Sequence, residues 1–233
     1  MSSYNPFALG PRAIAIWNVA RYMNLYVGGA RHLPHRGPAI VAARHYHHAY
    51  DGSALVHGLE RQPHLFVALD WTDSAFARQT MERACRLAEW PVAIRGERFG
   101  GGVAAAAPSA FERGEIQRYI RRAISYGAEL LVRGEVLGIF PEGYPTIDPA
   151  GSPKTHDDQY LPFRPGLLAI AARAERAGAG PIPIVPAGLA YRREGTRTRV
   201  TLRLGAPLRD ATTRPRAEVL AELETRVREL SRA

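Results

Sequence analysis

The 233-residue sequence contains almost no cysteine and no long apolar run. Cys85 is the only cysteine, which excludes an intrachain disulfide and argues against a thiolate metal centre. The longest stretch without Lys, Arg, Asp or Glu covers residues 177–191 and contains three prolines, so it cannot form a spanning helix of about 20 residues. The sequence therefore excludes a polytopic membrane protein. The first residues also lack the pattern of a secretion signal.

Lysine is almost absent too, because Lys154 is the only lysine among 31 basic residues. These outnumber 22 acidic residues and give a net charge of +9, which favours an anionic partner, either nucleic acid or an anionic lipid surface. No basic tract interleaved with aromatic residues and no recognition helix is evident, so charge alone supports a nucleic-acid-binding module.

Short apolar runs alternate with helical patterns along the chain. This alternation predicts a single α/β domain whose mixed, mainly parallel central sheet is flanked by helices. In such sheets, functional sites lie in the loops beyond the carboxyl ends of the strands. The main predicted strands are residues 38–43, 64–69, 91–94, 136–140, 182–185 and 199–204.

We expect the α/β domain to cover residues 31–233, after an apolar N-terminal helical segment at residues 1–30. Within that segment, residues 14–27 are apolar and aromatic, and Arg21 is their only charge. This pattern fits a helix packed on the core or an interfacial helix lying on a membrane. Residues 99–111 are rich in Gly and Ala, which predicts a mobile loop or a lid over a site.

Residues 44–51, directly after the first predicted strand, read Arg-His-Tyr-His-His-Ala-Tyr-Asp. One interpretation is a His/Asp dyad, in which the carboxylate orients an imidazole that takes a proton from a hydroxyl. A second is a metal-dependent hydrolase, because imidazole and carboxylate together suit zinc or iron. A third is a histidine-rich surface loop. The candidate ligands or dyad members are His45, His47, His48 and Asp51.

Two further strand ends carry candidate binding residues. Phe-Pro-Glu-Gly follows the strand at 136–140, where Glu142 can hydrogen-bond a substrate hydroxyl and Gly143 lets a ligand approach the backbone. Arg95 follows the strand at 91–94 and offers a rigid, charged fork suited to phosphate. Taken singly, each is also compatible with an ordinary turn or a surface arginine.

Four segments follow one another along the chain: the histidine segment at 44–51, the strand that ends near Arg95, Phe-Pro-Glu-Gly at 140–143 and the Pro-bounded strand at 182–185. In this order they resemble the motifs of the glycerolipid acyltransferases, in particular the 1-acylglycerol-3-phosphate (lysophospholipid) acyltransferase family. The resemblance runs from Arg31 to Leu208 and includes Phe-Arg-Pro-Gly at residues 163–166. The first motif departs from the family, since five residues rather than four separate His45 from Asp51. Only three residues separate His47 from Asp51, but we favour His45 because it directly follows the strand.

The resemblance implies acyl transfer from acyl-CoA or acyl carrier protein to a lysophospholipid hydroxyl, with no cofactor or metal. His45 would be the general base, Asp51 would orient it, and His47 and His48 would line the pocket. Arg95, with Arg98 nearby, would hold the acceptor phosphate, because Tyr-Pro replaces the family's Thr-Arg after Gly143. Glu142 and Gly143 would position the glycerol part.

The expected location is peripheral, on the cytoplasmic face of an anionic membrane. The expected partners are the two substrates, that membrane surface and possibly acyl carrier protein, with no nucleic acid.

Overall fold

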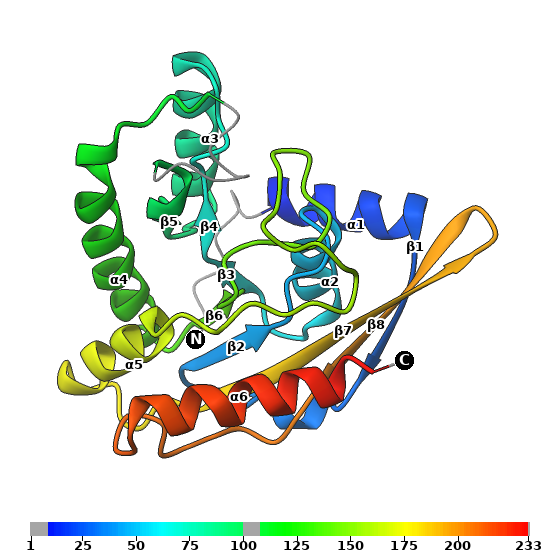
Figure 1. Cartoon of the computed structure of the whole chain (residues 1–233). Coiled ribbons are helices and arrows are strands. Elements are labelled where there is room, and N and C mark those ends of the chain that lie inside the picture. Colours follow the sequence, from blue (N-terminus) through cyan, green and yellow to red (C-terminus); the bar gives the residue numbers. More distant parts are fainter. Residues whose placement is uncertain (1–8, 100–107, 233) are drawn as a thin grey trace.

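The structure is a computed structural model that describes residues 9–99 and 108–232. In these residues a six-stranded sheet with the strand order β1-β8-β7-β2-β6-β3 forms the centre of the molecule (Figure 1). Only β7 and β8 are antiparallel to each other, and the other neighbours run parallel. The prediction of a mixed, mainly parallel sheet is confirmed. The strands are β1 (Met23–Gly28), β2 (Ala39–Ala43), β3 (Pro63–Leu65), β6 (Val136–Ile139), β7 (Ile184–Glu194) and β8 (Arg197–Leu204).

Helices cover both faces of this sheet. β2 is buried throughout, and its alternating side chains supply two cores because successive residues of a strand point to opposite faces. Ile40 and Ala42 pack in the core under α4 (Ile116–Val132), α5 (Gly166–Arg176) and α6 (Arg216–Leu230). Ala39, Val41 and Ala43 pack in the core under α1 (Leu9–Tyr22) and α2 (Tyr50–Gly58). Figure 1 shows α6 and α1 on opposite sides of the sheet.

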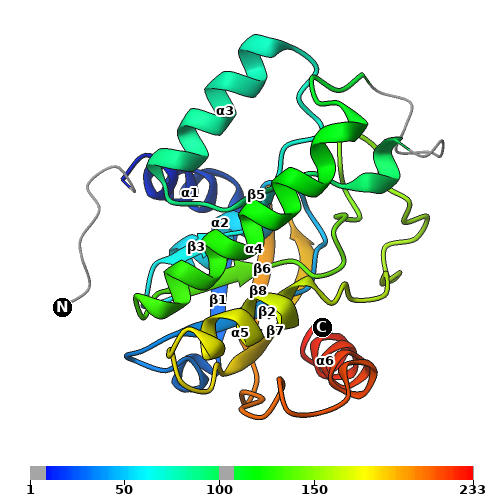
Figure 2. The same cartoon turned by 90° about the vertical axis from the view of Figure 1, so that its left-hand side faces the viewer.

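A smaller unit extends from one end of the sheet (Figure 2). It consists of the two-stranded parallel sheet β4 (Val67–Ala68) and β5 (Val92–Ala93), α3 (Ala75–Leu87) and the first part of α4. Its own core includes Leu69, Cys85 and Ile94. Burial raises the pKa of the Cys85 thiol to about 12, so this cysteine is not an available nucleophile at neutral pH.

Three predicted elements differ from the observed ones. The helix predicted over 14–27 ends at Tyr22, and β1 then forms within the predicted segment 1–30 by pairing with β8. The strand predicted over 64–69 is divided between the two sheets as β3 and β4. β7 continues to Glu194, well past the predicted end at 185, because its residues 187–194 pair antiparallel with β8.

No helix in the described ranges 9–99 and 108–232 has both the length and the apolar character needed to cross a membrane. Most of the Gly- and Ala-rich segment predicted as a loop or lid, at residues 100–107, lies outside the described residues.

Candidate active site

The candidate site lies beyond the carboxyl ends of β2 and β6, which are adjacent and parallel. Parallel strands end at the same edge of a sheet, so the histidine segment after β2 meets the Phe-Pro-Glu-Gly segment after β6. The His45 ring stacks on the ring of Phe140 at 4.4 Å between centroids and an angle of 17°. Tyr46 and His48 also pair with the backbone of Ile147 in the long connection between β6 and α5.

His45 and Asp51 form a direct hydrogen-bonded pair. His45 Nδ1 lies 2.8 Å from Asp51 Oδ2, although five residues separate them in the sequence and not the four of the family motif. Asp51 is fully buried in the first turn of α2, where a carboxylate is favoured by the helix dipole. The same oxygen accepts the N–H groups of Tyr46 at 2.6 Å and His47 at 3.0 Å. A proton on Nδ1 suits the carboxylate, and this leaves Nε2 as the basic nitrogen.

The second oxygen of Asp51 is held by a side chain of β7, the strand that pairs with β2. The Tyr191 hydroxyl, at the end of the buried part of β7, donates a hydrogen bond to Asp51 Oδ1. Burial, with the Asp51 charge as a second cause, raises the pKa of this phenol well above its ordinary value. Tyr191 therefore remains a donor at neutral pH, and both carboxylate oxygens of Asp51 are engaged.

The other two histidines have different surroundings. His47 Nδ1 accepts the N–H groups of Ala49 at 3.2 Å and Tyr50 at 3.3 Å, so it is unprotonated. Burial, reinforced by His48, lowers the pKa of His47 to about 4. His48 Nδ1 lies 3.3 Å from the carbonyl oxygen of Ile147. Within the part of the chain that the structure describes, no group of three or more His, Cys, Asp or Glu residues has the arrangement of a metal site.

Glu142 faces protein groups rather than open space. Its side chain is buried, Oε1 accepts the His45 N–H at 2.8 Å, and Oε2 accepts the Leu161 N–H at 3.0 Å. Oε2 also lies 2.6 Å from Nζ of Lys154, and this ammonium donates to the His45 carbonyl oxygen at 2.5 Å. Burial lowers the pKa of Lys154, and the adjacent Glu142 opposes that change.

Arg95 is buried at the end of β5 and is already partnered. Its Nε lies 3.0 Å from both carboxylate oxygens of Asp70, its Nη2 lies 2.9 Å from Oδ2, and Nη1 donates to the Gly143 carbonyl at 3.0 Å. The guanidinium also covers the ring of Tyr144 at 4.1 Å. Nη1 and Nη2 carry four N–H groups in total, and these contacts leave some of them unused. Arg98 lies in a short 3-10 helix, and its side chain is outside the described part of the structure.

Gly143 has a close guanidinium neighbour that the predictions did not include. The φ of +78° favours glycine at this position, and a Cβ there would lie 2.7 Å from Nε of Arg164 and displace its guanidinium. Arg164 is 37% exposed and pairs with Glu97 at 3.1 Å. Its guanidinium lies 5.6 Å from the centre of the Tyr144 ring, so Arg95 and Arg164 both adjoin Tyr144.

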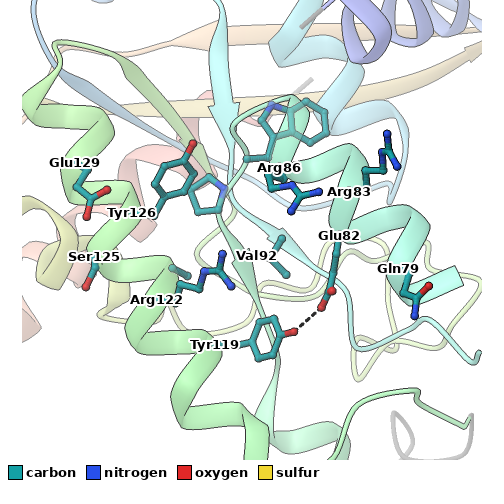
Figure 3. A pocket seen from close by; sticks show the side chains of 13 residues that line it. Gln79, Glu82, Arg83, Arg86, Val92, Tyr119, Arg122, Ser125, Tyr126 and Glu129 are labelled. Atoms are coloured by element: carbon teal, nitrogen blue, oxygen red, sulfur yellow. Dashed lines mark hydrogen bonds between the residues drawn. The ribbon is translucent and has the colours of Figure 1, made fainter. Parts of the chain in front are cut away.

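A separate cavity of about 690 Å³ lies between α3 and α4. Figure 3 shows side chains from both helices directed into the space between them, with Val92 of β5 at its base. The Tyr119 hydroxyl donates to Glu82, which also pairs with Arg78 at 3.3 Å. The lining of the cavity includes the arginines Arg83, Arg86 and Arg122 and the aromatic residues Trp90, Tyr119 and Tyr126. It contains no histidine–carboxylate pair among its lining residues.

A family model described as Acyltransferase matches residues 24–190, which is most of the chain and includes the residues after β2, β5 and β6. The chain belongs to the acyltransferase family. Its fold is similar to that of the 1-acyl-sn-glycerophosphate (LPA) acyltransferase PlsC from Thermotoga maritima, with a TM-score of 0.59 and 16% sequence identity. That match covers 95% of this acyltransferase and 77% of PlsC. Comparison with curated proteins gives no match.

Four residues of the candidate site were not predicted from the sequence. Tyr191 and Asp70 carried no local signal, because their partners Asp51 and Arg95 lie at least 25 residues away in the chain. Arg164 lies in the Phe-Arg-Pro-Gly segment, but its place beside Gly143 depends on a residue 21 positions away. Lys154 did carry one, since it is the only lysine in an arginine-rich chain.

Proposed function

We propose that this acyltransferase moves a fatty acyl group from an acyl thioester to the free hydroxyl of a lysophospholipid, with 1-acylglycerol-3-phosphate as the acceptor. The acyl donor is acyl-CoA or acyl carrier protein. The observation that carries the proposal is the His45–Asp51 pair at the carboxyl edge of the sheet of an acyltransferase-family chain. None of the hydrogen bonds within the described residues uses His45 Nε2, which leaves it available to a hydroxyl proton.

In the proposed reaction, His45 Nε2 removes the acceptor's hydroxyl proton as the oxygen attacks the thioester carbonyl. Asp51 stabilises the imidazolium that forms, because its Oδ2 accepts the Nδ1 proton. The tetrahedral intermediate then expels the thiolate, which takes the proton and leaves as the thiol. The oxygen–acyl bond replaces the sulfur–acyl bond, so this chemistry requires neither a metal nor a covalent acyl-enzyme.

The guanidinium groups around Gly143 would bind the acceptor phosphate. Among the described residues, the contacts of Arg95 leave N–H groups on Nη1 and Nη2 unused. The more exposed Arg164 needs only to exchange the surface carboxylate of Glu97 for a phosphate. Arg98 remains a further candidate. Gly143 presents a surface without a side chain beside them. Glu142 would act on the acceptor through His45, because both of its oxygens already bind protein groups.

We also propose peripheral attachment to an anionic membrane, on its cytoplasmic face, because both substrates carry acyl chains. The outer side of α1 exposes Ile14 (62%), Ile16 (45%) and Trp17 (58%). Its inner side packs on the sheet core, and Asn18 donates to Ser53 of α2 at 3.0 Å. Arg12 and Arg21 provide positive charge at the two ends of this apolar surface, which is the composition of an interfacial helix.

The direct test is an acceptor and donor panel with product analysis by mass spectrometry. Purified protein is incubated with isotope-labelled acyl-CoA or acyl carrier protein and with lysophosphatidic acid, lysophosphatidylcholine or monoacylglycerol. We expect the labelled diacyl product with lysophosphatidic acid in preference to the other two acceptors. Hydrolysis of the thioester without transfer, or dependence on a stoichiometric metal found by elemental analysis, would contradict the proposal and favour a hydrolase.

Membrane attachment is tested by sedimentation with vesicles. Vesicles containing 30% phosphatidylglycerol are expected to bind the protein more strongly than pure phosphatidylcholine vesicles, and Ile14→Ser with Trp17→Ser is expected to weaken both. Ala13→Ser with Ala20→Ser on the same helix is the matched control. Equal binding by the two double variants would contradict a role for this apolar surface.

A further inference from the structure

We infer that Lys154 is a positioning residue that, together with Glu142, fixes the peptide groups on both sides of His45. This inference rests on the proposed role of His45 as the base. Lys154 lies outside every motif that supports the family resemblance, in the connection between β6 and α5.

The three residues form a closed ring of contacts. The N–H of His45 donates to Glu142 Oε1 at 2.8 Å, and the carbonyl oxygen of His45 accepts from Lys154 Nζ at 2.5 Å. The ring closes through the ion pair between Lys154 Nζ and Glu142 Oε2 at 2.6 Å. One buried carboxylate and one buried ammonium therefore hold the backbone of a single residue at both of its polar groups.

The connection that carries Lys154 is anchored close to the site. Ser152 Oγ accepts the Lys154 N–H at 3.2 Å and donates to the carbonyl of Pro145 at 2.5 Å. Pro145 is three residues after Glu142, so the hydrogen bonds of Ser152 connect the backbone of Lys154 to the segment that follows Glu142. Both side chains of the pair are 0% exposed, which indicates that neither charge is there to meet solvent.

This arrangement separates positioning from substrate contact. Asp51 holds Nδ1 of His45, Phe140 stacks on its ring, and the Lys154–Glu142 pair holds its backbone. Nε2 is the polar atom of His45 left for a reactant. A misplacement of the base by about 1 Å can lower a rate about 10²-fold, so loss of Lys154 is expected to lower kcat. KM is expected to change little, because Lys154 does not touch the acceptor.

The inference is tested with Lys154→Met, Glu142→Gln and the double variant, assayed with lysophosphatidic acid. Each single substitution is expected to lower kcat about 10–100-fold with KM within about 2-fold of wild type. The double variant is expected to be no slower than the slower single variant, because the two residues act as one unit. Arg78→Met, which breaks a partly buried ion pair to Glu115 in the smaller unit, is the matched control and is expected to retain kcat.

Three outcomes would overturn the inference. A folded Lys154→Met enzyme with wild-type kcat would show that the contact has no catalytic consequence. A raised KM with unchanged kcat would place Lys154 in the acceptor site instead. Independent multiplication of the two single effects in the double variant would show that Lys154 and Glu142 do not act together.

A second measurement does not depend on the variants folding or on the assay. Since Lys154 is the only lysine, labelling with [15N]lysine places the label on one side-chain ammonium. We expect a wild-type ammonium signal that exchanges slowly with water, as a buried and hydrogen-bonded group does. Fast exchange would contradict the inference even if the acyl product forms, whereas slow exchange without any acyl transfer would leave the contact intact and refute the proposed function.

Discussion

Two regions of this acyltransferase are built from similar residues but organised differently. The strand-end cluster, formed by His45, Asp51, Glu142, Lys154 and Tyr191, has a continuous set of buried and partly buried polar contacts. The interhelical cavity between α3 and α4 has about 690 Å³ of space and a mostly exposed charged lining. A cavity of that volume is often the first choice for a ligand site.

Under the proposed function, the site of the chemistry is identified by the orientation of its polar groups and not by the volume of a cavity. In the strand-end cluster, each polar group of His45 except Nε2 has a partner, so this one atom is available for the proposed proton transfer. In the interhelical cavity, Glu82 is engaged by Arg78 and Tyr119, and no imidazole lies nearby among the lining residues. The predictions below test this distinction.

The largest effect is expected from Asp51→Asn. An amide in place of the carboxylate no longer selects the tautomer with the proton on Nδ1, and such a change in a His–carboxylate pair lowers kcat by about 10⁴-fold. We expect kcat, measured with saturating acceptor, to fall by about 10³–10⁴-fold. An enzyme that keeps more than a tenth of wild-type kcat would show that the pair is not the catalytic one.

A smaller loss is expected from Tyr191→Phe, which removes one hydroxyl without changing the ring. Asp51 Oδ1 then has no donor from β7, while Oδ2 keeps its contacts to His45 and the backbone. A hydrogen bond to a charged group contributes about 1.5–3 kcal/mol, so a decrease in kcat of about 10-fold is expected as Asp51 becomes less well held. Tyr46→Phe, in the ring stacked on Tyr191, is the control and is expected to change kcat by less than about 3-fold. Equal rates for the two variants would place Tyr191 outside the functional cluster.

A selective effect is expected from Arg164→Met. Removing this guanidinium beside Gly143 is expected to raise KM for lysophosphatidic acid about 10-fold, because a charge-assisted contact to phosphate is lost. KM for monoacylglycerol, which has no phosphate, is expected to stay the same. Arg173→Met, in the last turn of α5, is the control. A parallel rise in KM for both acceptors would indicate a general distortion of the site.

His47 predicts a pH dependence of stability rather than of turnover. Its pKa is about 4 in the folded protein and about 6.5 when unfolded, so the unfolded chain binds more protons between these values. Its contribution to stability is present above pH 6.5 and is lost as the pH falls towards 4. The free energy of unfolding is measured with urea at about pH 7 and about pH 4.5 for wild type and His47→Gln. The decrease between the two pH values is expected to be smaller for His47→Gln than for wild type. An identical decrease would contradict this account.

The smallest effect is expected in the interhelical cavity. Arg86→Ala and Arg122→Ala are expected to leave kcat and both KM values within about 2-fold of wild type, since neither side chain contacts the strand-end cluster. A large rise in KM for acyl-CoA would break the comparison directly. It would show that the cavity binds part of the acyl donor and that its volume has a functional meaning.

Local patterns in the sequence were sufficient for the central strands and for the His45–Asp51 neighbourhood. The apolar run before Arg44 predicts β2. Since β2 and β6 are parallel neighbours, the residues after β2 lie beside Glu142, which follows β6. The rest depends on partners that are distant in the chain. β1 continues the apolar run of α1 and becomes a strand only by pairing with β8, and the charged end of β7 likewise needs β8.

The same reason explains the roles that changed within the site. A sequence pattern shows that Glu142 and Arg95 follow strands, but it does not show that Lys154 and Asp70 are buried against them. Buried charges require partners, so both oxygens of Glu142 bind protein groups and the Arg95 guanidinium is partly occupied by Asp70 and Gly143. What the sequence left open was therefore which groups face a substrate and which hold other residues in place.

The most direct test of the account is a comparison of His45→Ala, His47→Ala and His48→Ala in the labelled acyl-transfer assay with lysophosphatidic acid. All three histidines lie within four residues, but of the three only His45 is paired with Asp51 through Nδ1. We expect His45→Ala to abolish formation of the diacyl product with the fold intact, and the other two variants to retain most of it. An active His45→Ala enzyme, or loss of product only in His47→Ala or His48→Ala, would contradict the assignment of the base.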